Sequence, residues 1–232
     1  MQNKITFRTD VTVDLVQAMA SDEAVVMAAR VSSGSGDDPD RNAGLINYLM
    51  RDRHGSPFEH NAFTFRIEAP IFVFREFMRH RIASYNEESG RYKQLDPVFY
   101  VPGPSRNLVQ VGKVGAYEFV PGGEGLTIMA QRAMIRVAED AYNHYLMMID
   151  NGIAREVARM VLPVNIYSSM YVTMNARSLM NFLSLRTKDE ASTYPSFPQR
   201  EIEMVAEKME EFFAEKMPLT YESFKKNGRV AP

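Results

Sequence analysis

Apolar and polar positions alternate along the chain in two different patterns. Phe63, Phe65 and Ile67 alternate with polar residues, which predicts a strand over residues 61–69. Within residues 126–151, apolar side chains recur at spacings of three, four or a multiple of these, as on a helix with one buried face. By similar patterns we expect further helices over residues 21–31, 43–53, 71–80, 176–185 and 199–216, a short one ending at Leu162, and strands over residues 5–15 and 164–173.

Local signals mark the ends of several of these elements. Ser21 is a suitable N-cap for a helix with acids in its first turn, and Gly152 and Pro163 are suitable stops. Residues 32–42 and 103–125 are rich in Gly, Pro or polar residues, so we expect loops there. Helices and strands follow each other without a regular βαβ rhythm. This predicts an α+β fold with a mixed sheet and packed helices, as a single domain over residues 1–232.

Composition narrows the class of protein. The 232 residues are 45% hydrophobic and 24% charged, which is typical of a soluble globular protein. A net charge of −2 gives no overall field that would attract nucleic acid or an anionic membrane. No apolar run reaches the length of a membrane span, and the first ten residues lack the apolar core of a signal peptide. We therefore expect a cytoplasmic protein.

The chain contains no cysteine. This excludes disulfides, thiolate metal sites and any thiol nucleophile.

The densest group of polar side chains lies in residues 79–92, which hold three Arg, one His, two Ser, one Asn and two Glu. Arg guanidinium groups bind phosphate in a planar fork, and Ser hydroxyls with backbone amides near a Gly can complete an anion site. From composition alone, a solvated turn held by salt bridges is an equally good interpretation.

This stretch resembles the signature of flavin-dependent thymidylate synthases, which is Arg-His-Arg, seven further residues and Ser. In this chain the matching residues are Arg79, His80, Arg81 and Ser89. Three more segments resemble the same family in the expected order: residues 54–60, 155–163 and 175–186.

The resemblance implies a fold of that family, not a Rossmann domain, and an enzyme that converts dUMP to dTMP. FAD reduced by NADPH would supply hydride, and methylenetetrahydrofolate would supply the carbon. The residues it implies for FAD are Ser56, Arg79, His80, Arg81, Ile82, Asn175, Arg177 and Asn181. It also implies that Ser32 touches the flavin and that His54 lies near the flavin and the folate. Those it implies for dUMP are Glu76, Arg79, Glu87, Glu88, Ser89, Gly90, Arg91, Arg159 and Arg186. It also implies a homotetramer with sites shared between subunits.

Arg186 is the leading catalytic candidate. On a helix from Ala176 it falls in register with the apolar stripe of Leu179, Phe182 and Leu183. A cation there needs a partner, unless it reaches out to water or caps the last carbonyls of the helix. Beside a uracil it would stabilise charge that develops on the ring, since Arg cannot act as a base.

Ser89 is the other candidate, as a nucleophile, but no adjacent His is placed to deprotonate it. We therefore expect Ser89 to bind substrate.

The sequence departs from the family pattern at one position and in one segment. Glu76 stands where Gln is common, and a carboxylate near a nucleotide phosphate needs neutralisation, for which Arg75 and Arg79 are the nearest candidates. After Arg186, residues 187–198 form a longer segment than usual and lack a family His.

Two other functions are alternatives. A metal-dependent hydrolase would use His54, Glu59, His60 and His80, but their spacing matches no strong zinc motif, and we expect no metal. A nucleic-acid-binding module would use Arg79, Arg81 and Arg91, with Tyr85 and Tyr92 stacking on bases. The acidic balance and the interleaved glutamates argue against it.

Overall fold

The computed structural model describes residues 4–32, 41–113 and 116–232. The chain forms two compact units. The first unit comprises residues 1–11, 68–75 and 87–169, and the second comprises residues 12–67, 76–86 and 170–232. The chain passes from one unit to the other within β3 (Ala62–Pro70), α4 (Ile71–Phe77), β4 (Ser84–Glu87) and β8 (Tyr167–Asn175).

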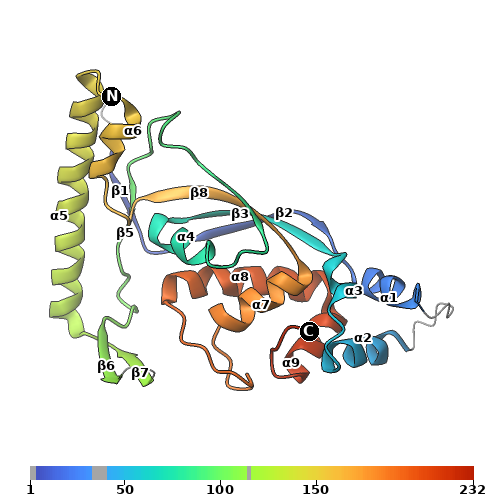
Figure 1. Ribbon diagram of the computed structural model, residues 1–232. Coiled ribbons are helices and arrows are strands. Elements are labelled where there is room, and N and C mark those ends of the chain that lie inside the picture. The colour runs from blue at the N-terminus through green and yellow to red at the C-terminus, as the bar shows by residue number, and fades with distance from the viewer. Residues whose placement is uncertain (1–3, 33–40, 114–115) are drawn as a thin grey trace. The chain divides into compact units, whose positions relative to one another are not determined.

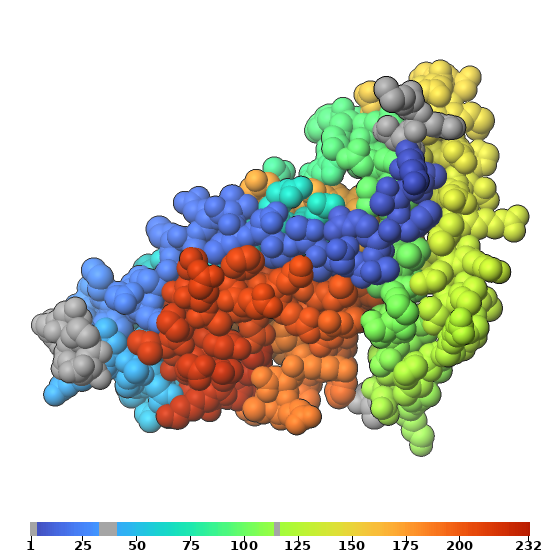
Figure 2. Space-filling model, turned by 180° about the vertical axis from the view of Figure 1, so that it is seen from behind, coloured from blue at the N-terminus to red at the C-terminus, as the bar shows by residue number. Residues whose placement is uncertain are grey.

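The largest sheet has the strand order β2-β3-β8-β4, with β2 at Thr12–Met19, and most of its residues belong to the second unit. Phe63, Phe65 and Ile67 of β3 are fully buried, so the strand and its inner face are confirmed. The ring of Phe63 meets Phe213 of α8 (Arg200–Lys216) edge to face, with centroids 6.1 Å apart. Figure 2 shows β2 lying along the C-terminal helices of the same unit.

The helices of the second unit begin and end close to the expected positions. The hydroxyl of Ser21 accepts a hydrogen bond from the backbone N–H of Ala24, which confirms the predicted cap. Figure 1 shows α7 and α8 side by side against the sheet. The helices are α1 (Asp22–Arg30), α2 (Asn42–Arg51), α3 (Ser56–Glu59), α7 (Ala176–Arg186), α8 and α9 (Pro218–Lys226), of which α3 and α9 were not predicted. Residues 33–40 of the expected loop lie outside the described residues.

The first unit is built around α5 (Gly123–Asp150). The buried Ala138, Tyr142 and Tyr145 form its inner face, and Gly152, at φ +82°, follows its end, as predicted. The Tyr142 hydroxyl donates to the carbonyl of Leu95 and the Tyr145 hydroxyl accepts from its N–H. The other elements of this unit are the parallel pair β1 (Thr6–Arg8) and β5 (Val98–Tyr100), the hairpin β6 (Val109–Lys113) and β7 (Ala116–Val120), and α6 (Arg155–Ala158) followed by the 3₁₀ turn η2 (Arg159–Val161).

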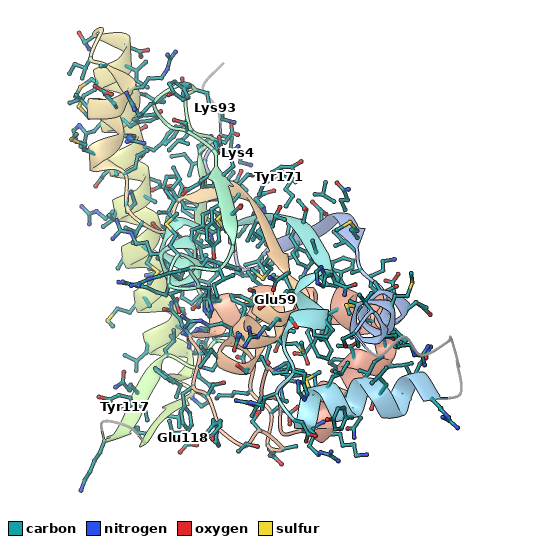
Figure 3. The ribbon with its side chains drawn as sticks, turned by 45° about the vertical axis from the view of Figure 1, so that its right-hand side comes forward. Lys4, Glu59, Lys93, Tyr117, Glu118 and Tyr171 are labelled. Carbon is teal, nitrogen blue, oxygen red and sulfur yellow. The ribbon has the colours of Figure 1, made fainter. Side chains whose placement is uncertain are left out.

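The hairpin corrects one prediction, because residues 103–125 are not mostly loop. Val109 pairs with Val120 and Val111 with Glu118 in an antiparallel ladder. Tyr117, labelled with its neighbour Glu118 in Figure 3, is 37% exposed. A two-stranded ribbon with little buried surface does not impose a regular apolar face, so its sequence carries a weak strand pattern.

The fold is therefore α+β, as expected. In the described part of the chain, no sheet has the strand-helix alternation of a Rossmann domain. None of its helices combines the length and the apolar character needed to span a bilayer. The single domain over residues 1–232 stays a prediction.

Candidate active site

Helix α7 places Arg186 at its C-terminal end. The helix begins where the side-chain oxygen of Asn175 accepts a hydrogen bond from the N–H of Ser178, at 2.8 Å. Leu179, Phe182 and Leu183 are fully buried, which confirms the predicted apolar stripe. Arg186 follows in the same stripe and only 19% of its side chain is exposed. The alternative in which it extends to water is therefore wrong.

The Arg186 guanidinium is held by two groups of the second unit. Its Nη1 lies 3.2 Å from Glu76 Oε2, and its Nε donates to His80 Nε2 at 3.1 Å. Predicted residues from two distant parts of the sequence, Glu76 with His80 and Arg186, thus meet at one point. The expected neutralisation of Glu76 by Arg75 or Arg79 is corrected, because its ion-pair partner is Arg186.

Burial sets the protonation of both partners. It lowers the pKa of His80 to about 4, and the nearby Arg186 charge acts in the same direction, so the imidazole is neutral near pH 7 and its Nε2 can accept a hydrogen bond. Burial also raises the pKa of Glu76, with a contribution from Glu201, against the opposing effect of Arg186. Glu76 Oε1 is buried and, among the described residues, has no hydrogen-bond partner. This oxygen is open to a donor from a ligand.

A second group of predicted residues surrounds Gly55. A Cβ at this position would lie 2.5 Å from Arg177 Nε and 2.9 Å from the carbonyl oxygen of Pro232, so only glycine allows this packing. Arg177 also pairs with Glu59 of α3, at 2.7 Å between Nη1 and Oε1, and Glu59 is labelled in Figure 3. The exposed Ser56 follows Gly55 directly.

The remaining predicted flavin residues of the second unit are exposed. They are Arg79, Arg81, Asn181 and Ile82. The apolar side chain of Ile82 is 72% exposed. The Tyr85 hydroxyl lies 2.7 Å from the carbonyl oxygen of His80 and holds this loop. Tyr85 is thus engaged with its own chain, which does not support its predicted role as a base-stacking platform, whereas Tyr92 is 79% exposed.

In the first unit, two of the predicted segments meet at one cavity of about 320 Å³. Four predicted dUMP residues line it: Glu87, Glu88, Gly90 and Arg159. Burial raises the pKa of Glu87, with a contribution from Glu88, while Ser168 and Arg159 oppose the shift. The cavity therefore combines guanidinium groups with a carboxyl, that of Glu87, whose pKa is raised.

Gly90 is needed for the close approach of Arg159. A Cβ there would lie 3.1 Å from Leu95 Cδ1 and 3.3 Å from Arg159 Cδ. A larger residue would therefore push on the guanidinium stem that lines the cavity.

Arg75 and Ser168 also line this cavity and were not among the predicted site residues. The sequence indicated Arg75 only as a neighbour of Glu76. Ser168 is a buried hydroxyl residue within the apolar pattern of residues 164–173, and that polar interruption was the available signal.

Ser89 and Arg91 are predicted dUMP residues that do not line the cavity. Arg91 Nε pairs with Glu156 Oε2 at 3.0 Å on the surface, and its backbone N–H donates to Ser89 Oγ at 3.3 Å. Ser89 is thus part of a turn, and its expected role as a substrate-binding hydroxyl stays a prediction.

Across residues 4–32, 41–113 and 116–232, no three His, Asp or Glu side chains are grouped so that they could hold a metal ion. The alternative of a metal-dependent hydrolase has no ligand set in this part of the chain.

Comparison with known proteins gives a consistent result. The model of the family described as "Thymidylate synthase complementing protein" matches residues 14–219. A flavin-dependent thymidylate synthase of Streptomyces avermitilis is 61% identical over 99% of this chain and 96% of its own length. One from Tropheryma whipplei is 57% identical over 97% of both chains. The solved structure of the UMP/dUMP methylase PolB from Streptomyces cacaoi, bound with 5-Br UMP, covers 99% of this chain and 100% of its own with a TM-score of 0.94 and 53% identity.

Proposed function

Since the chain belongs to the family of flavin-dependent thymidylate synthases, we propose that it methylates dUMP to dTMP with a flavin as the source of hydride. The observation that carries this proposal is the cavity of the first unit. Glu87, Glu88 and Gly90 of the signature loop meet Arg159 there, although some 70 residues separate them in sequence. At about 320 Å³ the cavity is within the size range of ligand pockets.

The first unit offers what a nucleotide needs. Arg159 and Arg75 supply guanidinium groups for phosphate, and the carboxyl of Glu87, in which burial favours the protonated form, can donate to or accept from a sugar or base. We propose that Ser89 and Arg91 contribute from the adjoining turn after Arg91 leaves Glu156.

Taken by itself, the second unit offers Arg186 and Glu76 as groups that suit a pyrimidine base. The Arg186 guanidinium stabilises negative charge on the pyrimidine as ring carbon 5 attacks the incoming carbon. Neutral His80 accepts a hydrogen bond from Arg186 Nε, which fixes the plane of the guanidinium without neutralising it. Glu76 Oε1, with no partner among the described residues, offers an acceptor to an N–H of the ring.

The donor set of the second unit fits FAD. The exposed guanidinium groups of Arg79 and Arg81 suit a pyrophosphate, and the exposed Ile82 suits a flat apolar ring. Ser56, Arg177 and Asn181 offer further polar groups. Asn175 uses its side-chain oxygen to cap α7, which leaves its amide N–H₂ for a ligand. A bound flavin supplies hydride to the transferred carbon.

We further propose NADPH as the reductant and methylenetetrahydrofolate as the carbon donor, in a homotetramer. Exposed apolar side chains on α5, such as Met129 at 62% and Val137 at 56%, support an assembly. The molar mass of the purified protein in solution, measured by light scattering, tests it. A mass near four chains is expected, and a monomer would contradict it.

UMP is a second candidate substrate, because the UMP/dUMP methylase is 53% identical to this chain. Both nucleotides carry uracil and differ at the sugar 2′ position. Comparing kcat/KM for dUMP and UMP separates the two. We expect dUMP to be preferred, as the 57–61% identical thymidylate synthases suggest.

The visible absorbance of the purified protein tests the proposed function. We expect a yellow protein whose flavin band bleaches with NADPH and dUMP and returns as dTMP forms on addition of methylenetetrahydrofolate. A colourless protein that cannot be reconstituted with FAD would overturn the proposal.

A further inference from the structure

Thr187, the residue that follows Arg186, is fixed at every polar atom. It is 4% exposed. Its N–H and its hydroxyl both donate to the carbonyl oxygen of Leu183, at 3.0 and 2.8 Å. Its own carbonyl accepts from Ser196 Oγ at 2.7 Å. The end of α7 is therefore held by side chains in addition to the helix hydrogen bonds.

The hydroxyl of Thr187 is in turn bound by Arg229. Arg229 Nη2 donates to Thr187 Oγ1 at 2.6 Å, and only 2% of the Arg229 side chain is exposed. Both terminal nitrogens of Arg229 reach Glu210 of α8, at 2.6 and 2.9 Å. Asp189, two residues beyond Thr187, lies 3.4 Å from Nη1. A buried charge network thus links α8 to the residue next to Arg186.

Forming this network is energetically unfavourable in two respects. Arg229 has φ +56°, a region that side chains other than Gly seldom adopt, and its buried Nε has no hydrogen-bond partner among the described residues. The preceding Gly228 has φ +69°, and a Cβ there would collide with the Thr193 hydroxyl. Two buried charges seldom stabilise a fold more than apolar residues of similar size. Stability alone is therefore a weak explanation for this arrangement.

We propose that Thr187, Arg229 and Glu210 are positioning residues for Arg186. Glu76 and His80 hold the tip of the Arg186 side chain, while the network fixes its backbone end, so the guanidinium is set from both sides. This inference rests on the proposed function, in which Arg186 acts on the base of dUMP. It gives the long segment 187–198 a role, because the network anchors that segment at Thr187 and Asp189.

The test uses the full-length protein loaded with FAD and measures the Kd for dUMP by calorimetry. Thr187→Val keeps the shape of the side chain but removes the hydroxyl, and Thr187→Ser restores it. Glu210→Gln removes the charge of the carboxylate that binds both terminal nitrogens of Arg229. Its matched control is Glu207→Gln, because Glu207 also lies on α8 and also binds an arginine with both oxygens, but on the surface. Each variant is measured at a temperature where circular dichroism shows it folded.

We expect Thr187→Val and Glu210→Gln to weaken dUMP binding about tenfold, because a small displacement of a positioned group has a large effect. Thr187→Ser and Glu207→Gln should stay within about twofold of wild type. In an Arg186→Ala background, Thr187→Val should have no further effect, since residues that act through one another are not additive.

Two results would overturn the inference while leaving the proposed function intact. One is a folded Thr187→Val variant with the wild-type Kd. The other is an equal loss of affinity with and without Arg186, which would mean that Thr187 acts independently of it. If wild-type protein binds FAD but not dUMP, the proposed function itself fails, and the inference with it.

Discussion

At the scale of single residues, Arg186 combines a fixed position with a charge that is only partly neutralised. Its Nε donates to a neutral imidazole and its Nη1 to a carboxylate whose pKa burial raises. A guanidinium in a partly dry site acts on developing charge more strongly than one in water. The contact with Glu76 also implies that substrate has to share or displace that carboxylate.

Arg186→Lys keeps the charge but loses the planar fork that reaches Glu76 and His80 together. We expect the rate of dTMP formation to fall about 100-fold while flavin content is unchanged. The measurement is single-turnover formation of dTMP, with the exposed Arg200→Lys on α8 as control. A near wild-type rate for Arg186→Lys would show that this guanidinium is not catalytic.

Gly90→Ala tests the cavity of the first unit. The added Cβ would crowd Leu95 and the stem of Arg159, which have to move by a few tenths of an ångström. We expect KM for dUMP to rise about tenfold, with the flavin spectrum unchanged. Gly44→Ala is the matched control, because a Cβ there meets nothing within 4 Å. Equal KM values for both variants would remove Gly90 and Arg159 from the binding site.

His80 gives a pH dependence of stability. Its pKa of about 4 in the folded protein is below the ordinary 6.5, so between these values the unfolded chain binds more protons. His80 therefore makes the free energy of unfolding decrease as pH falls from about 6.5 to about 4. The raised pKa values of Glu76 and Glu87 act in the opposite direction, so the effect of His80 has to be isolated by difference.

Denaturant unfolding of wild type and His80→Gln at pH 7 and pH 5 provides this difference. The stability of wild type relative to the variant should be lower at pH 5. A relative stability that is the same at both pH values would show that His80 titrates normally in the folded protein.

At the scale of elements, α9 shows how a short helix depends on a distant partner. Asp22 of α1 accepts hydrogen bonds from the N–H groups of Leu219 and Thr220 and from the Thr220 hydroxyl, at 2.6 to 2.9 Å. These bonds satisfy backbone donors at the start of α9. The residue before the helix, Met217, provides no side-chain cap.

Asp22→Ala should lower the free energy of unfolding by about 1–3 kcal/mol, because it leaves buried donors without partners. Urea unfolding followed by circular dichroism measures this, with the exposed neighbour Glu23→Ala as control. A change for Asp22→Ala no larger than that for Glu23→Ala would contradict the cap.

The same example explains which elements the sequence could predict. Helices α5 and α7 and strand β3 bury one face, so the core imposes their periodicity and the sequence shows it. Helix α9 is stabilised by a residue almost 200 positions away, and the hairpin β6–β7 buries little surface, so neither leaves a clear local pattern.

For the candidate site, the signature loop and Arg159 were identified through the family resemblance. The Glu76–Arg186 pair and the Thr187–Arg229 bond depend on contacts over 110 and 42 residues that no local pattern contains.

At the scale of the whole molecule, the absence of cysteine limits the chemistry. With no thiol in 232 residues, ring carbon 6 of the uracil cannot be activated by a thiolate. Methylation then needs another way to activate the base, and in any case it needs a source of hydride, because a transferred methylene group has to be reduced to a methyl group. In the proposed mechanism, Arg186 supplies the first and a bound flavin the second.

The most direct test of this mechanism is the hydrogen content of the product methyl group when the reaction runs in D₂O. Hydrogen on the nitrogen of a reduced flavin exchanges with solvent, whereas hydrogen on the carbon of a folate does not. We predict that mass spectrometry will find deuterium in the methyl group of dTMP made from dUMP, NADPH and methylenetetrahydrofolate. If dTMP forms in D₂O as fast as in H₂O but its methyl group contains no deuterium, the hydride comes directly from the folate. That result would contradict the mechanism.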